Sequence, residues 1–459
     1  MKTAKILGAL MLLGFGANAM ACPKSNSTMN AKEGVRNGQK FCAIRSTDVK
    51  KPAQILETTT FKADTLYVLG SGLYVGDNNM RANNESKIQL IIEPGTKIMG
   101  QSEKAYLQIN RGAQIIANGT KEAPIVMTTA KPNNRTRGSW GGLIINGSAP
   151  VNGCAEDATA TCELKGEGLT SYTYGGANVA DNSGVLNYVV VEFAGNAITA
   201  DNELNGIAFQ GVGNGTEVDY IQVHMNADDG IEFFGGTVDV KHVVLTGNLD
   251  DSLDWTSGWK GSAQFVIVKQ SPDAANYGIE ADNFSKRMSA TPRSAPTLAN
   301  LTLIGSDTSA GAKGGSGILL RKGTGAHILN SYITGFSASC FDIDDAETFR
   351  NAKEGSAENG NNPGIVLENI FFNCATTFTP VEFIDKEKTV KEPWEIGGFV
   401  LAQSGNVEKD LGLVGYTPVE GSNLVEMTNF SDVINTDYVG AVKNAADTWY
   451  ADWTTSVKN

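Results

Sequence analysis

The chain has 459 residues, of which 52 are glycine and 13 are proline, and only 19% carry a charge. Its formal net charge is −13, which argues against a nucleic acid as partner, because phosphate binding requires clustered lysine and arginine. The same charge favours binding of cations, or of neutral and acidic polymers through bridging cations.

Residues 1–21 have the pattern of a secretory signal peptide. Lys2 and Lys5 form its positive end, residues 6–15 its apolar run, and Ala19-Met20-Ala21 its small-residue cleavage site. The apolar run is too short to span a membrane, and no later segment is long enough. We therefore expect export to the periplasm, the cell surface or the medium, with no transmembrane segment.

The six cysteines form three local pairs in the sequence, with none left over. The predicted disulfides are Cys22–Cys42, Cys154–Cys162 and Cys340–Cys374. Paired cysteines indicate an oxidising compartment, in agreement with export. Cys22 follows the cleavage site directly, as a lipidated cysteine does, but Ala19 stands where a lipoprotein signal usually has leucine. Lipidation would also leave Cys42 without its partner, and the sequence leaves this alternative open.

The mature chain divides into three predicted regions. Residues 22–60 are polar and irregular, and we expect them to form an N-terminal cap. In residues 61–375, short apolar runs alternate with glycine and asparagine, which is typical of strands of a few residues joined by turns. Residues 376–459 are more acidic and aromatic, and we expect a C-terminal capping region there. A solenoid needs such caps because its ends otherwise expose apolar rungs and unpaired strand edges.

Two consecutive stretches, which start at Val218 and Val240, repeat one pattern 22 residues apart. The repeated positions include Asn226 with Asn248, Asp228 with Asp250, Asp229 with Asp251, Ile231 with Leu253, Glu232 with Asp254 and Phe233 with Trp255. A period this short is one coil of a solenoid. It predicts an all-β fold, a right-handed parallel β-helix, because the alternative sandwich or propeller would not stack residue on residue at this spacing.

Several motifs resemble those of known β-helix proteins. The motifs Glu93-Pro94-Gly95-Thr96, Arg111-Gly112-Ala113 and Gly119-Thr120 before Pro124-Ile125-Val126 resemble the pectate-lyase-like superfamily. Residues 138–147, 181–186, 192–195 and 437–441 are similar to a narrower family of exported bacterial β-helix proteins. The resemblance covers most of the mature chain. It implies the fold, export and a surface or extracellular location, but no reaction.

Acidic residues stack on the outside of successive predicted coils. The repeat places Glu232 beside Asp254, and alignment across longer loops adds Glu280, then Leu319, which interrupts the column, and Asp342. Carboxylates in neighbouring strands, about 4.8 Å apart, repel one another. A bound Ca²⁺ or a shared proton would offset this repulsion. The predicted metal ligands are Glu232, Asp254, Glu280, Asp228 and Asp250; the alternative is a solvated acidic face with aspartates as turn formers.

The resemblance to pectate lyases implies a further role for this column. In those enzymes acidic residues bind Ca²⁺, which holds a uronate, and a basic residue removes a proton. Arg321 is the catalytic candidate here, with Lys286 and Arg287 in a neighbouring loop. The simpler interpretation is that Arg321 lies between Asp282 and Asp344 and forms a salt bridge with them. The Gly-His-Gly and Arg-Ile-Lys signatures of polygalacturonase-type hydrolases are absent from the sequence. The aromatic residues expected outside the coil, where they could stack on sugar rings, are Phe234 and Trp259.

Three functions follow as hypotheses. The first is an exported, non-enzymatic binding, adhesion or structural module that binds a polysaccharide or a cell-surface partner with the help of Ca²⁺. The second is a polysaccharide lyase that uses the acidic column and Arg321. The third is a surface protein that associates with itself end to end through strand edges, which terminal caps would oppose. The missing catalytic signatures favour the first.

Overall fold

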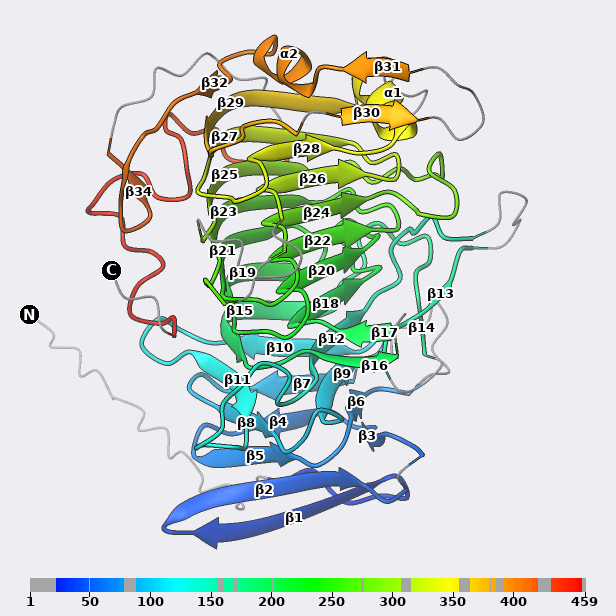
Figure 1. Ribbon diagram of the computed structural model, residues 1–459. Helices are drawn as coiled ribbons and strands as arrows, with labels where there is room; N and C mark the ends of the chain where they lie inside the picture. The colour runs from blue at the N-terminus through cyan, green and yellow to red at the C-terminus, as the bar shows by residue number, and fades with distance from the viewer. Residues whose placement is uncertain are drawn as a thin grey trace, which may run out of the picture.

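The computed structural model describes residues 22–48, 50–77, 88–154, 161–168, 172–199, 202–273, 276–306, 315–354, 364–379, 381–384, 391–419 and 431–455. These residues form a parallel β-helix, whose coils stack from the blue N-terminal hairpin to the orange strands at the opposite end (Figure 1). The predicted all-β fold is confirmed. The predicted signal peptide lies outside the described residues. No helix among the described residues is long and apolar enough to cross a membrane.

The larger sheet has 16 strands and forms one side of the coil. Its main path runs through β1 (Met29–Arg36), β2 (Gln39–Ser46), β5 (Thr65–Leu69), β8 (Lys97–Gly100), β11 (Ile125–Thr129), β15 (Gly184–Glu192), β19 (Glu217–His224), β21 (Val240–Thr246), β23 (Ser262–Lys269), β25 (Thr297–Ile304), β27 (Ala326–Thr334), β29 (Ile365–Asn373) and β32 (Val407–Glu408). The strands β4 (Thr59–Phe61), β7 (Gln89–Ile92) and β10 (Gln114–Asn118) join the same sheet beside it. β10 and β11 pair with the first and second halves of β15. The coils before β15 therefore contribute two short strands each to this sheet, and the coils from β15 onward contribute one long, bent strand.

The second sheet has ten parallel strands and carries the acidic residues. Its strands are β3 (Ala53–Ile55), β6 (Leu73–Val75), β9 (Tyr106–Ile109), β12 (Gly142–Asn146), β18 (Ile207–Gln210), β20 (Ile231–Phe234), β22 (Leu253–Thr256), β24 (Ile279–Asp282), β26 (Ile318–Arg321) and β28 (Phe341–Ile343). The register places Glu232 opposite Asp254, as the 22-residue repeat predicts. The pairings of Glu280 with Leu319 and of Leu319 with Asp342 confirm the alignment across the longer loops.

The interior of the coil holds the apolar residues of the repeat. Phe233 and Trp255 are fully buried register partners, but the ring of Phe233 stacks on Trp259, with 3.8 Å between ring centroids. The prediction that Trp259 is exposed to sugars was therefore wrong. Its ring fills the core, and its indole N–H donates to the carbonyl of Val238. Phe234 points outward but is half-buried, with its ring edge against Tyr174.

The long parallel strands of the larger sheet from β15 to β29 each bend at one residue with a positive φ. These residues, opposite one another in successive coils, are Tyr188, Tyr220, His242, Phe265, Asn300, Asn330 and Asn369, with φ from 47° to 59°. Asparagine and histidine adopt this left-handed conformation more readily than tyrosine and phenylalanine do. We call the four aromatic members (Tyr188, Tyr220, His242 and Phe265) the corner ladder. The C-terminal residues 431–455, red in Figure 1, run along this side of the coil.

The region predicted to be an irregular N-terminal segment is ordered instead. An antiparallel hairpin of β1 and β2 occupies that end, and β2 continues the parallel sheet through β5. The stretch 22–26 lies along the outer edge of β1, where the N–H of Asn26 donates to the carbonyl of Met29 and the N–H of Ala31 donates to Ser25 Oγ. The polar side chains of this region gave no sign of the β1–β2 hairpin in the sequence. Residues 22–26 occupy part of the free edge of β1.

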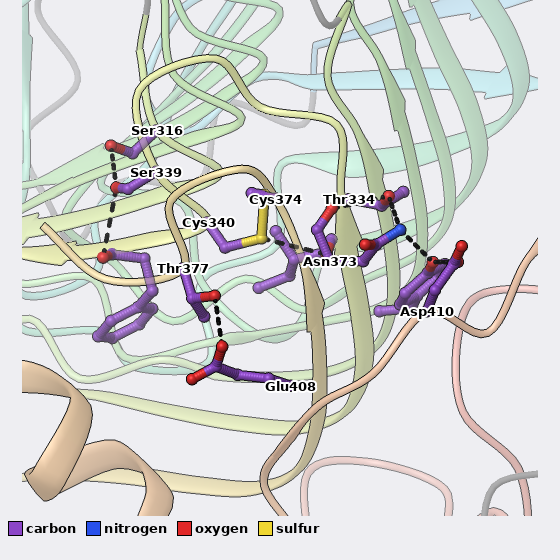
Figure 2. Close-up of a disulfide and its surroundings, with 12 residues drawn as sticks. Ser316, Thr334, Ser339, Cys340, Asn373, Cys374, Thr377, Glu408 and Asp410 are labelled. Atoms are coloured by element: carbon purple, nitrogen blue, oxygen red, sulfur yellow. Dashed lines mark hydrogen bonds between the residues drawn. A yellow bond between two sulfur atoms is a disulfide. The ribbon is translucent and has the colours of Figure 1, made fainter.

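The opposite end contains short elements around the last coils. They are α1 (Ala346–Glu354), β30 (Val381–Ile384), β31 (Lys391–Trp394), α2 (Ile396–Leu401), β33 (Leu413–Val414) and β34 (Thr417–Pro418). The three predicted disulfides are all present. Figure 2 shows Cys340–Cys374, which closes the last coil beside the hydrogen bonds of Ser316 with Ser339 and of Thr377 with Glu408.

Candidate cation site

An acidic column lies on the outside of the second sheet. Glu232, Asp254 and Glu280 are the second residues of β20, β22 and β24, and the register places them opposite one another. In each strand the residues on either side of the acid are fully buried in the core. Since side chains alternate along a strand, the acid points away from the core. The column is three coils long, because the buried Ala208 and Leu319 occupy its two ends.

Two aspartates reach the same place from the turns before β20 and β22. Asp229 accepts a hydrogen bond from the N–H of Asp251 in the next coil, at 3.0 Å, and Asp251 accepts one from the N–H of Tyr277, at 2.7 Å. Both side chains are more than nine-tenths buried. These bonds cap turn amides, as the turn-former interpretation expects, and each occupies one oxygen of its carboxylate.

Two hairpins outside the regular coils complete the surroundings. The first is formed by β13 (Leu164–Lys165) and β14 (Thr173–Tyr174), and the second by β16 (Asn196–Thr199) and β17 (Asn202–Leu204). They contribute Glu167 and Glu203. The amide of Asn205 donates to Glu232 Oε2 at 2.6 Å and to Glu167 Oε2 at 3.3 Å, so it lies between the hairpin and the column.

Together these residues line an acidic pocket of about 210 Å³. Its lining residues are Glu167, Glu203, Asp228, Asp229, Glu232, Asp250, Asp251, Asp254 and Glu280. All five predicted metal ligands line the pocket. This volume is below the range of about 300–1,000 Å³ typical of sites for drug-sized ligands, and all nine lining residues are acidic.

Several carboxyl groups of the pocket have a raised pKa. Burial first, and then repulsion between neighbouring carboxylates, raises the pKa of several acids well above its usual value: Glu167, Asp229, Glu232, Asp251 and Asp254. Burial also raises the pKa of Glu280, to about 7, although the charge of Arg321 acts against this rise. These acids are therefore harder to ionise than exposed carboxyl groups, and a bound cation would act against this effect.

Arg321 is placed at one end of the column. Its guanidinium donates to Asp282 Oδ1 at 2.7 Å and also to Glu280 Oε2. Burial alone would lower the pKa of Arg321, but the charges of Asp282 and Glu280 outweigh it and raise the pKa above its ordinary value. The other predicted neighbour, Asp344, is exposed. The contacts with Asp282 and Glu280 give Arg321 the salt-bridge role that the sequence also allowed.

The other basic candidates point elsewhere. Lys286 is exposed, and Arg287 donates to the carbonyl of Asn152.

Two sets of carboxylates have oxygens close enough to share an ion, within 4.8 Å of one another. The first set is Asp229, Glu232 and Asp254, and the second is Asp251, Asp254 and Glu280. The sequence interpretation chose Asp228 and Asp250 from the turns, whereas these compact sets contain their neighbours. The 22-residue repeat contains both the pair Asp228 with Asp250 and the pair Asp229 with Asp251, so the sequence alone could not choose between them. Glu167 and Glu203 carry no periodic signal, because their hairpins interrupt the coils.

The fold and this pocket define the class of the protein: a parallel β-helix that carries an acidic site on the outside of its coils. The model of the family described as the pectate-lyase like beta helix domain matches residues 53–455. The chain belongs to this family. Searches of curated proteins and of solved structures found no match.

Proposed function

We propose that this chain is an exported, non-enzymatic β-helix protein that binds an acidic polysaccharide through Ca²⁺ held in the acidic pocket. The observation that carries the proposal is the stacking of half-buried carboxylates from three successive coils, which together with Asp229 and Asp251 form two sets whose oxygens lie within 4.8 Å of one another. The family and the three disulfides are compatible with an exported carbohydrate-binding role.

The donor set supports Ca²⁺ in particular. Both compact ligand groups among the described residues consist of carboxylates, and Ca²⁺ takes six to eight oxygens in flexible geometry. Three carboxylates supply between three and six oxygens, so that water or a carboxylate of the ligand can complete the shell. A uronate polymer offers such carboxylates. The cation would thus join two negatively charged partners, which explains how a chain with a net charge of −13 can bind an acidic polymer.

The contacts of Arg321 support binding over lyase chemistry. A base must accept a proton, but two carboxylates hold this guanidinium in its protonated form. Its hydrogen bonds to Glu280 and Asp282 also direct two of its nitrogens toward the protein rather than toward a ligand. End-to-end association is the weaker alternative, because residues 22–26 occupy part of the free edge of β1.

Calorimetric titration tests the cation site. Ca²⁺ titrated into the chelator-treated protein should bind, and Glu232→Gln with Asp254→Asn should lower the affinity at least tenfold. The matched control is Glu57→Gln with Asp437→Asn, which removes the same charge from exposed residues in salt bridges with Lys24 and Lys443. Equal affinity in both double variants would place the cation outside this pocket.

Binding to polygalacturonate distinguishes the functions. Pull-down of the protein should require Ca²⁺ and should be lost in the pocket variant but not in the control. During the same incubation, the absorbance of unsaturated uronate should stay constant. A rise that disappears in an Arg321→Lys variant would instead establish the lyase.

A further inference from the structure

The two carboxylate sets of the pocket are one arrangement repeated in adjacent coils. Each set contains a turn aspartate and a column acid of one coil, together with the column acid of the next coil. Asp229, Glu232 and Asp254 in the first set correspond to Asp251, Asp254 and Glu280 in the second. The translation between them is one strand spacing, about 4.8 Å. The structure therefore offers two equivalent places for an ion rather than one.

We propose that the pocket binds two divalent cations, one in each coil, with Asp254 as the ligand they share. This inference rests on the proposed function, because it takes the pocket to be a cation site, and it specifies how many ions the site holds.

The register limits the repeat to two. One coil before the first set, the same positions hold Asn205 and Ala208, so that the charged turn residue and the column acid are both missing. One coil beyond the second set, they hold Tyr277 and Leu319, which is buried. Neutral residues thus bound the pair of carboxylate sets on both sides.

Two buried oxygens at the pocket are an independent sign of a ligand. Asp254 Oδ1 is inaccessible to solvent and has no hydrogen-bond partner among the described residues. The same is true of Asn205 Oδ1, on a side chain that is only 1% exposed. Because the amide nitrogen of Asn205 contacts Glu232 and Glu167, its head group lies at the pocket wall. Buried polar oxygens are costly unless something binds them. A cation shared through Asp254 would satisfy the first of these oxygens.

Charge supports the same number. Nine carboxylates line the pocket, and Arg321 contacts only Glu280 among them in the described residues. Two divalent ions, one in each set, would place a cation beside every carboxylate that the two sets contain.

Stoichiometry is the decisive measurement. The full chain, freed of metal by a chelator, is dialysed against Ca²⁺ and bound metal is counted by native mass spectrometry and calorimetry. Two ions per chain are expected. Asp229→Asn and Glu280→Gln should each reduce the count to one, since each keeps the shape of its side chain and changes one set. Asp254→Asn should weaken both sites at least tenfold, and Asp64→Asn, on the exposed partner of Lys40, should leave two.

The possible results separate the two proposals. One ion in the unmodified protein, lost in Asp254→Asn, would overturn the pair of sites and leave the proposed function intact. No ion at millimolar Ca²⁺ would overturn both. Equal counts in the unmodified protein and in the Asp229→Asn and Glu280→Gln variants would also refute the assignment of one ion to each set.

Discussion

Two columns on the outside of this β-helix, the corner ladder and the acidic column, each place similar side chains in successive coils. The side chains attract one another in the first column and repel one another in the second. In the corner ladder the rings lie nearly parallel, with centroids 4.4 Å apart for Tyr188 and Tyr220 and 4.3 Å apart for Tyr220 and His242. In the acidic column the same strand spacing brings carboxylates together. Rings gain from this spacing and carboxylates repel. The solenoid therefore brings equivalent side chains together in successive coils. Aromatic rings stabilise one another in such a column, whereas carboxylates need a bound cation or proton to offset their repulsion.

The chain itself covers the first column. Trp453 meets Tyr188 and Tyr220 edge to face, at 5.5 and 6.2 Å between centroids, and Trp449 meets His242 at 5.0 Å. Beside the ladder, Val190, Val244 and Ile267 form a second apolar cluster with the C-terminal residues. The acidic column has no comparable cover among the described residues, and it borders a pocket. The comparison predicts that the ladder contributes stability and that the column costs stability until cations bind.

The largest effect should follow from removing the cover of the ladder. Trp453 is 3% exposed, and its indole N–H donates to the carbonyl of Trp449. We expect Trp453→Ala to lower the free energy of unfolding by about 3–5 kcal/mol, as for other buried large-to-small changes. Denaturant titration measures the loss, and hydrogen exchange should locate it to the corner ladder.

A conservative change provides the control. Trp453→Phe keeps a ring against Tyr188 and should lose clearly less stability than Trp453→Ala. If Trp453→Ala were no more harmful than Val35→Ala, at an exposed residue, the C-terminal segment would not stabilise the ladder.

The next effect concerns the acidic column and pH. Glu280 has its pKa raised from 4.5 to about 7, which corresponds to about 3 kcal/mol between its two protonation states. Between these pH values the native state binds more protons than the unfolded state. The free energy of unfolding of the chelated protein should therefore fall as the pH rises from 4.5 to 7. The other pocket acids with raised pKa act in the same direction.

The matched variant isolates this contribution. Burial lowers the pKa of His224 and His327, so these residues remove stability as the pH falls below 6.5 and oppose the trend. The difference between the unmodified protein and Glu280→Gln, measured by denaturant titration at several pH values with chelator, cancels the histidines. A difference that does not change between pH 4.5 and 7 would contradict the raised pKa. Saturating Ca²⁺ should abolish most of the loss at pH 8.

The two columns also differ in how far the sequence predicts them. The acidic column was predictable because spacing alone places Glu232 opposite Asp254, and its extension to Glu280 and Leu319 held in the structure. The corner ladder was not, since its four aromatic residues lie at bends with a positive φ, which the alternation of apolar residues along the strands does not indicate. The C-terminal segment that covers it lies about 200 residues away in sequence, and no periodicity connects the two.

Two further errors have physical causes. Trp259 follows a turn, where exposure is the usual expectation, yet the coil is wide enough for its ring to stack inside on Phe233. Glu167 and Glu203 come from hairpins inserted between coils, whose length and direction the repeat does not determine. The sequence repeat therefore predicts the residues that the regular coils bring together. The residues contributed by inserted hairpins, such as Glu167 and Glu203, are seen only in the structure.

The smallest effect tests how the C-terminal segment is held beside the ladder. The buried side-chain amide of Gln222 makes two hydrogen bonds with the backbone of Thr455. Its Nε2 donates to the carbonyl of Thr455, and its Oε1 accepts from the N–H of Thr455. Gln264 makes the same pair of bonds with Ile434. Since each neutral hydrogen bond contributes about 0.5–1.5 kcal/mol net, we expect Gln222→Ala to cost about 1–2 kcal/mol.

Hydrogen exchange and metal counting separate this attachment from the acidic column. Gln222→Ala should speed exchange at residues 449–455, and Gln264→Ala should do so near Ile434, because each glutamine holds a different part of the segment. Gln222→Glu keeps the acceptor but loses the donor and buries a negative charge against the carbonyl of Thr455, so it should cost at least as much stability as Gln222→Ala. The number of bound cations should not change in any of these variants. A changed cation count would show that the two columns are coupled through the coil rather than independent.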